Sequence, residues 1–314
     1  MSSNPPRAGR AAVAVSLVLV QVFFGVHYLA AKILLRDIPP RAWAVLRVTA
    51  GAAVLLAAAF ALRRRLPREP RDLGLLALFS VFGVVVNQVC FVEGLYRTTP
   101  THSAILNTTI PVGTLLFALL LGRETLDGGK ILSILLALGG VLLVVHPERA
   151  TFGSATLAGD LLTLANALSY GFFLVISKRA LARMDPLAAT AVLMSFGAVG
   201  ILAIGGPSLA AVDLSSIPAR TWGLGAFIVL FPTVGAYYLT YWALARVESS
   251  TVALFVYLQP VIAAALSALV LGERPTVRVL AGAALVFLGV YVAVAHPRLR
   301  AAARARTART GEVP

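Results

Sequence analysis

Charged residues and cysteine are scarce in this sequence of 314 residues. Asp, Glu, Lys and Arg make up 13% of it, about half the usual share of a soluble domain, whereas 59% of the residues are hydrophobic. The mean hydropathy is +0.88. The single cysteine, Cys90, excludes an intramolecular disulfide and a cysteine-based metal cluster. This composition excludes a soluble globular protein and indicates a chain that lies mostly in a membrane.

The motifs of membrane enzymes are missing as well. The sequence has no H-E-x-x-H, no G-x-S-x-G and no P-loop, since Gly128-Gly129-Lys130 lacks the upstream glycine and the following Ser or Thr. Its four histidines are scattered along the chain. We therefore expect no catalytic residues, no bound metal and no cofactor, and a protein that is not an enzyme.

The chain contains long runs of apolar residues that are candidate membrane spans. The length gives room for about ten spans of about 20 residues each, and the sequence predicts an all-α membrane protein with ten transmembrane helices. The runs lie at 11–31, 42–62, 73–92, 98–122, 131–145, 161–177, within 186–204, within 221–245, at 249–272 and at 279–295. The first run is too long for the apolar region of a signal peptide and lacks a cleavage site. His-Pro pairs at 146–147 and 296–297 are expected to end the fifth and tenth spans.

Part of the sequence occurs twice. Residues 94–124 align with residues 243–273 with seven identities in 31 positions, among them Pro111 with Pro260. Residues 13–40 align in the same way with residues 159–186. We therefore predict a first repeat at 11–147, a second at 155–297 and a basic cytoplasmic tail at 298–314. Because each repeat has an odd number of spans, the two five-helix repeats are expected to be inverted relative to each other.

The positions of Lys and Arg predict the orientation. With the N-terminus in the cytoplasm, the inner segments carry 18 of these residues and the outer segments carry eight. Both ends are therefore expected to be cytoplasmic, in a multi-pass protein of a bacterial cytoplasmic membrane. The net charge of +14 is then mainly a signal of topology, and no nucleic-acid partner is expected. Lipid binding by the tail around Arg304 and Arg306 is a further option.

Several motifs together resemble one family. They are Phe24-Gly25…Lys32 and Tyr170-Gly171…Lys178, Arg47 in the second span, Pro111 and Pro260, and the sequences Leu121-Gly122-Arg123-Glu124 and Leu271-Gly272-Glu273. Over nearly its whole length the chain resembles the drug/metabolite transporter superfamily, in its EamA-like ten-helix branch. A weaker likeness, to plant nodulin-like exporters of that superfamily, rests on residues between Asn87 and Asn107.

The resemblance implies a secondary transporter, usually an exporter, with both termini in the cytoplasm. It also implies a cavity lined by helices one, three, four, six, eight and nine. It implies no particular substrate, because the superfamily carries amino acids, nucleotide sugars, sugar phosphates, drugs and other metabolites. The second repeat has Leu193 where the first has Arg47, so a role of this arginine would be confined to one half.

Polar and aromatic side chains in the middle of the spans are the candidate substrate-binding residues. In a bilayer each such group needs a partner or a water-filled cavity. The candidates are Gln21, Phe24, Tyr28, Asn87, Gln88, Phe91, Asn107, Asn166, Tyr170, Tyr237, Tyr241 and Gln259. Taken singly, each could instead form a hydrogen bond between helices, and Tyr241 could belong to an aromatic belt. Their recurrence in several spans favours a shared polar cavity.

Pro111 and Pro260 are candidate hinges. Each removes a backbone donor and leaves the carbonyl four residues earlier, that of Asn107 or Val256, without its helical partner. A kink without function is the alternative. Two matched prolines in inverted repeats favour a hinge or a cavity wall.

His27 and Arg47 are the ionisable residues that lie clearly inside spans. His27 could couple transport to proton movement, or simply donate a hydrogen bond near the outer face. Arg47 could bind an anion, extend to the interface or bond to the carbonyl end of a helix. Glu124 and Glu273 flank spans and are expected to cap a helix or to pair with a neighbouring arginine.

The polar residues expected in the middle of the spans include no Asp or Glu. A carrier of simple cations would be expected to bury a carboxylate, so amides and phenols favour a neutral or zwitterionic substrate. The prediction is a secondary transporter that exports small metabolites such as amino acids by alternating access. A channel-like facilitator and a multidrug efflux carrier are the alternatives. The expected partners are a small-molecule substrate and the lipid bilayer, with proton coupling and a homodimer left open.

Overall fold

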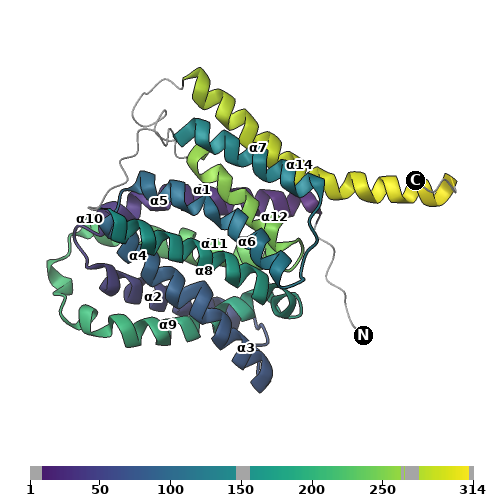
Figure 1. Cartoon of the computed structure of the whole chain (residues 1–314). Helices are drawn as coiled ribbons and strands as arrows, with labels where there is room; N and C mark the ends of the chain where they lie inside the picture. The colour runs from purple at the N-terminus through teal and green to yellow at the C-terminus, as the bar shows by residue number, and fades with distance from the viewer. Residues whose placement is uncertain (1–8, 146–155, 263–264, 266–275, 311–314) are drawn as a thin grey trace.

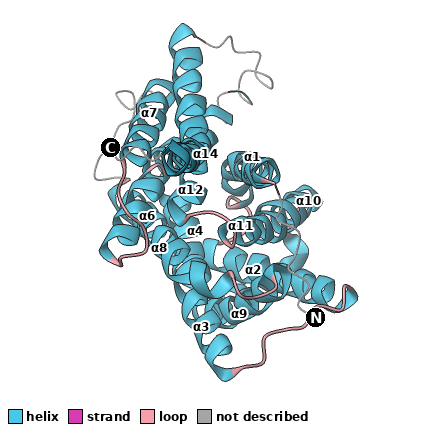
Figure 2. Ribbon diagram, turned by 90° about the vertical axis from the view of Figure 1, so that its right-hand side faces the viewer, coloured by secondary structure: helices cyan, strands magenta, loops and turns pink. Residues whose placement is uncertain are grey.

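A computed structural model describes residues 9–145, 156–262, 265 and 276–310 (Figure 1). Within these ranges the chain forms helices joined by loops and contains no strand (Figure 2). The helices lie side by side in one bundle, and the C-terminal part of the last helix projects from it (Figure 1). The expectation of an all-helical protein is therefore confirmed over the described residues.

The first half of the chain contains two long uninterrupted helices followed by two that change geometry along their length. Its elements are α1 (Arg10–Leu34), α2 (Pro40–Ala61), α3 (Pro70–Ser80), the π-helix η1 (Val81–Val86), α4 (Asn87–Arg97), α5 (Pro100–Asn107), α6 (Thr109–Leu120) and α7 (Gly128–Val145). The three segments α3, η1 and α4 form one continuous helix, whereas Thr108 interrupts the path from α5 to α6.

The second half follows the same order. Its elements are α8 (Leu157–Leu181), α9 (Pro186–Ala210), the short 3₁₀ turn η3 (Leu214–Ser216), α10 (Ala219–Ile228), the π-helix η4 (Val229–Gly235), α11 (Ala236–Leu244), α12 (Ser249–Leu254), the 3₁₀ turn η5 (Phe255–Tyr257) and α14 (Val277–Thr310). Again the third helix contains a π-helical segment, and again the fourth becomes irregular in its middle.

Seven of the helical segments are long and apolar enough to cross a membrane. They are Ala11–Leu34, Pro40–Ala61, Pro70–Arg97, Ser103–Leu120, Leu157–Leu181, Pro186–Ala210 and Ala219–Leu244. Three shorter apolar helices, Gly128–Leu143, Ser249–Ile262 and Val277–Ala293, correspond to the predicted fifth, ninth and tenth spans. Large apolar side chains such as Leu29, Phe60 and Leu120 are well exposed on the outside of the bundle, as expected of surfaces that face lipid.

The apolar part of the tenth helix ends at Ala293, close to the predicted end of the span, but the helix itself does not end at His296-Pro297. α14 continues through this pair to Thr310, so most of the predicted tail is helical. The segment beyond Pro297 is rich in alanine and arginine, which are among the strongest helix formers, and this preference outweighs the backbone donor that the proline removes. The other His-Pro pair and Glu273 lie outside the described residues.

Helices of one half pack mainly against helices of the other. α2 packs against α9, α7 against α14, α1 against α11, α4 against α8, and α6 against α12. By position in the repeat, α1 corresponds to α8 and α4 to α11. If the two halves exchange places, the α1–α11 contact becomes the α8–α4 contact. The pairs α2–α9, α7–α14 and α6–α12 each consist of two corresponding helices, so they stay the same.

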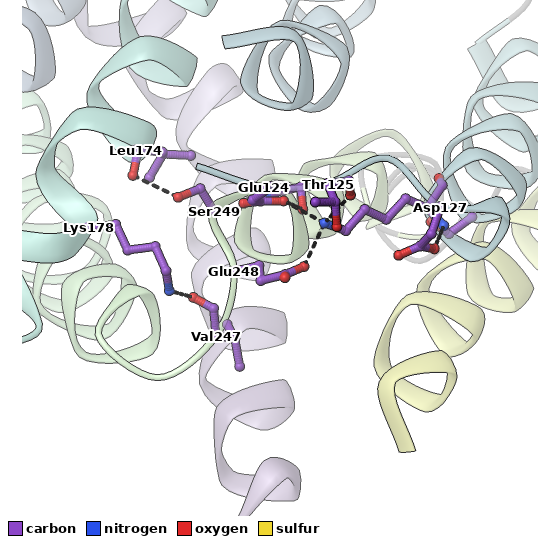
Figure 3. A network of polar contacts seen from close by, with 11 residues as sticks. Glu124, Thr125, Asp127, Leu174, Lys178, Val247, Glu248 and Ser249 are labelled. Carbon is purple, nitrogen blue, oxygen red and sulfur yellow. Dashed lines mark hydrogen bonds and ion pairs between the residues drawn. The ribbon is translucent and has the colours of Figure 1, made fainter. Parts of the chain in front are cut away.

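Two lysines at matching positions make the same kind of contact in the two halves. Lys32 in α1 donates from its Nζ to the carbonyl oxygen of Leu95, 2.6 Å away in the last turn of α4. Lys178 in α8 donates to the carbonyl of Leu244 at 3.3 Å, at the end of α11, and to that of Val247 (Figure 3). A cation at a helix C-terminus satisfies carbonyls that have no helical partner and complements the helix dipole.

The contact between α7 and α14 depends on two matched glycines. A Cβ atom built on Gly140 would lie 2.5 Å from the carbonyl oxygen of Gly282, and one on Gly289 would lie 2.7 Å from that of Ser133. Such distances are too short for any side chain. The two helices can approach this closely only because both positions lack a side chain.

Gly140→Ala should therefore destabilise the protein by about 1–3 kcal/mol, because the added methyl group forces α7 and α14 apart. The neighbouring Gly139 has open space at its Cβ position, so Gly139→Ala is the matched control and should leave stability unchanged or slightly raised. Thermal unfolding of the two variants in the same detergent measures the difference. Equal midpoints would contradict the assigned contact.

Candidate functional site

A single cavity brings together most of the predicted site residues. The empty space at this cavity is about 650 Å³, and part of that space is open to solvent. Its lining residues are Gln21, Phe24, His27, Tyr28, Arg47, Asn87, Gln88, Phe91, Asn107, Ile110, Asn166, Tyr170, Tyr237, Thr240, Val252, Val256 and Gln259. None of these described residues is an aspartate or a glutamate.

Both halves of the chain contribute to the cavity. The first half supplies residues of α1, α2, α4, α5 and α6, and the second half supplies residues of α8, α11, α12 and η5. In the view of Figure 2, α1, α4, α8, α11 and α12 lie around the middle of the bundle. The cavity therefore lies between the halves, where a relative movement of the two would change its shape.

One wall of the cavity is a hydrogen-bonded cluster of side chains. Gln88 donates from Nε2 to the hydroxyl oxygen of Tyr237 at 2.5 Å, and the Tyr237 hydroxyl lies 3.3 Å from Asn87 Oδ1. Asn166 donates from Nδ2 to the backbone carbonyl of Asn87 at 2.8 Å. Because Tyr237 and Asn166 belong to the second half, these bonds join the two halves at the cavity.

The two π-helical segments lie directly before this cluster. A π-helix leaves a backbone carbonyl without its usual partner, and such segments occur frequently at functional sites. Ser169 of α8 donates to the carbonyl of Phe82 in η1 at 2.8 Å, and the Tyr237 hydroxyl donates to that of Gly83 at 3.3 Å. In η4, Thr233 donates to the carbonyl of Ile228, five residues earlier, at 2.9 Å. Side chains thus satisfy the carbonyls that the π-helices release.

A second wall joins α1 to the helical turn after η5. Tyr28 donates its hydroxyl proton to Gln259 Oε1 at 3.0 Å, and Gln259 donates from Nε2 to Gln21 Oε1 at 2.7 Å. Asn107 uses one amide proton for the carbonyl of Ser103, 2.9 Å away and one turn earlier. These bonds fix the amide groups and orient their remaining donors and acceptors.

Arg47 is almost completely buried, with an exposed fraction of 1%. Its Nε donates to Thr233 Oγ1 at 2.6 Å and its Nη1 to Gln88 Oε1 at 2.9 Å. Nη2 has no hydrogen-bond partner among the described residues. The expectation that Arg47 extends to the interface or bonds to a helix end is therefore wrong, because two neutral side chains hold it inside the bundle at the cavity wall.

His27 also lies at the cavity and is 2% exposed. Its ring stacks on Phe91, with centroids 5.1 Å apart. Its Nε2 is buried and has no hydrogen-bond partner within the described residues. This nitrogen therefore has unused hydrogen-bonding capacity in a residue that lines the cavity.

The helices that carry the two prolines are irregular just before them. α5 ends at Asn107 and α6 begins at Thr109, so Pro111 lies in the first turn of a new helix, where a missing backbone donor costs little. In the second half the 3₁₀ turn η5 precedes Pro260 in the same way. Both prolines are buried.

The cavity contains eleven of the twelve predicted substrate-binding residues. The exception is Tyr241, whose ring is buried against Phe173 and Tyr237, with centroids 5.3 Å and 5.9 Å away. An aromatic belt position is equally wrong for it, because only 1% of this residue is exposed. The sequence analysis missed four lining residues, Ile110, Thr240, Val252 and Val256. Thr240 follows Tyr237 by three residues and so lies on the same helical face, which was a usable signal, whereas the apolar residues gave none.

A second polar network lies outside the cavity and also joins the halves (Figure 3). Lys130 Nζ lies 3.0 Å from Glu124 Oε2 and 2.9 Å from Glu248 Oε2. The backbone N–H of Ser250 donates to Glu124 Oε1 at 3.2 Å, and its hydroxyl donates to Oε2. The side chain of Glu124 is only 3% exposed. Glu124 thus pairs with a lysine and caps α12 of the other half, rather than pairing with Arg123.

Tyr237 and Tyr241 form a matched test of this geometry. Tyr237→Phe should destabilise the protein by about 1–3 kcal/mol, because it leaves the buried Nε2 of Gln88 without its acceptor. Tyr241→Phe should be neutral or slightly stabilising, because the hydroxyl of Tyr241 is buried with no partner among the described residues. Thermal unfolding of both variants gives the comparison, and an equal loss in the two would contradict the hydrogen-bond assignment.

Comparison with known proteins identifies the family to which the chain is related. A sequence model of the EamA-like transporter family matches it twice, at residues 12–146 and 157–295. The uncharacterized transporter YetK of Bacillus subtilis is 28% identical over 290 residues, which are 89% of this chain and 86% of that protein. An uncharacterized transporter of Archaeoglobus fulgidus is 26% identical over 88% of this chain and 97% of its own length.

Two further proteins are similar to the chain over most of its length. An uncharacterized protein of Pseudomonas aeruginosa is 31% identical over 91% of this chain and 96% of its own length. A protein known from a crystal structure shares the fold, with a TM-score of 0.73 at 20% identity over 91% of this chain and 96% of that one. Since the two matches of the family model span nearly the whole chain, this multi-pass helical membrane protein belongs to the EamA-like transporter family.

Proposed function

We propose that the protein is a secondary transporter that exports small neutral or zwitterionic metabolites, such as amino acids, by alternating access. The observation that carries this proposal is the cavity between the two halves, lined by amide, phenol and aromatic side chains from both. A site in the middle of the membrane, at the interface of two repeats, is typical of carriers whose halves move relative to each other.

The proposed architecture has ten transmembrane helices in two inverted five-helix repeats. In it the three shorter apolar helices also cross the membrane. Support comes from the family model, which matches each half separately, and from features that recur at matching positions. These are the π-helices η1 and η4, the lysines Lys32 and Lys178, and the glycines Gly140 and Gly289. With the charge distribution of the sequence, this architecture puts both ends of the chain in the cytoplasm.

The chemistry of the cavity supports the substrate class. Amides and phenols offer directed hydrogen bonds, and Phe24, Phe91 and Tyr170 offer aromatic faces for an apolar part. A simple cation would need an acidic group, and no described lining residue supplies one. The outward direction follows from the resemblance to a superfamily that consists mostly of exporters, and the bacterial cytoplasmic membrane follows from that resemblance and from relatives in bacteria.

Alternating access needs a closure that can open, and the network around Glu124 supplies a candidate. It joins the α6–α7 connection of the first half to the start of α12 in the second. By the predicted orientation this is the cytoplasmic side. Its strength depends on charged groups near the membrane surface, which can separate and be solvated more cheaply than a hydrophobic contact in the bilayer centre.

The breaks before Pro111 and Pro260 are the proposed hinges. At each, the helix changes geometry beside the cavity, at Asn107 in one half and at Val256 in the other. A bend at either point would move the part of the helix on one side of the break, while the part on the other side stays packed. A channel-like facilitator would not need such paired breaks, and a multidrug carrier would not need so many directed hydrogen bonds.

The direct test is counterflow in liposomes that contain the purified protein. With a panel of amino acids and related metabolites, at least one unlabelled compound inside should accelerate uptake of the same labelled compound. A carrier exchanges substrate across a barrier that reorients, so exchange should exceed net uptake. A channel would show no acceleration, and exchange of none of the compounds would contradict the proposed function.

The proposed closure has its own test. In a Cys90→Ser background, Glu124→Cys and Ser250→Cys place two thiols where the two halves meet. A short bifunctional thiol reagent that joins them should abolish counterflow almost completely, because the cytoplasmic side can then no longer open. Each single-cysteine variant treated with the same reagent is the control and should retain exchange. Normal exchange in the cross-linked protein would exclude this contact as a gate.

A further inference from the structure

Among the described residues that line the cavity, Arg47 carries the one strongly charged group, and its neighbours in the described part of the chain leave the charge uncompensated. The two hydrogen bonds that hold it go to a threonine hydroxyl and to a glutamine carbonyl oxygen, both neutral. In the described part of the chain no acidic side chain forms an ion pair with Arg47, and ion pairs such as Arg41 with Glu93 and Lys130 with Glu124 lie elsewhere. A buried cation without a counter-ion is costly in a membrane, so its retention calls for a function.

The surroundings of Arg47 hold it in a fixed orientation. Thr233 accepts the proton of Nε while its own hydroxyl is bound to the carbonyl of Ile228. Gln88 accepts the proton of Nη1 and is held in turn by Tyr237. These supports leave Nη2 buried and without a partner among the described residues, in a side chain that lines the cavity. Arg47, a lining residue of the cavity, thus keeps one charged donor in a fixed orientation with unused hydrogen-bonding capacity.

A second unsatisfied nitrogen belongs to the same cavity. His27 Nε2 is buried and has no partner in the part of the chain that the structure describes, and the ring stacks on Phe91. When Nε2 carries the proton it is another donor for an anionic oxygen. The second half offers no equivalent charge, because Leu193 occupies the position that corresponds to Arg47 and is fully buried in α9.

We infer that Arg47 Nη2, with His27 Nε2 beside the same cavity, receives a carboxylate group of the transported molecule. This inference rests on the proposed function and narrows it to substrates that carry one carboxylate, either zwitterions or monocarboxylates. One free guanidinium nitrogen and one imidazole suit a single negative charge, whereas a phosphate dianion would require more positive charge. The ammonium group of a zwitterion would be held by amide and phenol oxygens.

The test compares each carboxylate with its own amide. Purified full-length protein is screened by thermal shift and calorimetry against the proteinogenic L-amino acids, a set of small monocarboxylates and the amides of both groups. At least one acid should bind, and its amide, which has the same shape without the charge, should bind roughly 100-fold more weakly. The decarboxylated amine should not bind measurably.

Substitutions in α2 test whether Arg47 is the residue that binds the carboxylate. Arg47→Gln should weaken the bound acid roughly 100-fold, whereas Arg47→Lys keeps the charge without the planar geometry and should weaken it roughly 10-fold. Arg41→Gln, on the same helix but at its surface, is the control and should bind normally, since Glu93 keeps Arg97 as a partner. The empty Arg47→Gln protein should unfold at nearly the same temperature as the parent, because the loss of the bonds to Thr233 and Gln88 is offset by removal of an uncompensated buried charge. If the arginine were merely structural, the variant would unfold at a clearly lower temperature.

Other outcomes separate the two proposals. If an amide binds as well as its acid, if no carboxylate binds, or if Arg47→Gln binds the acid normally, the Arg47 assignment is overturned. Counterflow of a neutral compound in that case would leave the transporter function standing. Tight binding of a carboxylate that is lost in Arg47→Gln, without any counterflow, would support the binding site and overturn the transport proposal.

Discussion

A bilayer offers no hydrogen-bond partner to a backbone carbonyl or to a polar side chain, so each such group must be satisfied within the protein or face a wet cavity. The irregular parts of this bundle follow that constraint. The π-helices η1 and η4 release carbonyls in the middle of spans, and the side chains of Ser169, Tyr237 and Thr233 take them up. The side chains that do this for η1 come from the other half of the chain. The bonds that make the irregular backbone tolerable therefore also assemble the cavity wall and join the two halves.

The same constraint makes the exceptions informative. Arg47 Nη2 and His27 Nε2 are buried in side chains that line the cavity and have no partner among the described residues, whereas the neighbouring amides are bonded. Polar groups left unsatisfied in this way favour a state in which something else binds them. In the proposed closure around Glu124 and Lys130, by contrast, the charged groups have partners, and the contact of Glu124 with Ser250 joins the two halves. A binding site that lacks a partner, together with a closure made of separable ion pairs, is the arrangement that a carrier with two alternating states requires.

Much of the fold could be predicted from sequence because apolar runs and repeat offsets are long-range patterns that single residues do not disturb. The helix boundaries that failed depended on local competition, as at Pro297, where the alanine- and arginine-rich segment keeps α14 helical. In the site, a polar residue in mid-span was a reliable guide to the cavity, as with Asn87, Asn166 and Gln259. Tyr241 was misplaced because the period of the helix does not tell which of two tyrosines one turn apart faces the cavity. The partners of Arg47 could not be predicted, because Thr233 approaches it only through the extra residue of a π-helical turn.

The central claim is that one cavity between the halves is reached in turn from each side of the membrane. Its most direct measurement places a cysteine at a lining position, by Thr240→Cys in a Cys90→Ser background. A membrane-impermeant thiol reagent is then applied to intact cells and, separately, to inside-out vesicles. The account predicts that the cysteine is modified in both preparations, and that a transported compound protects it in both. Modification from one side only, or protection from neither side, would contradict alternating access to this cavity.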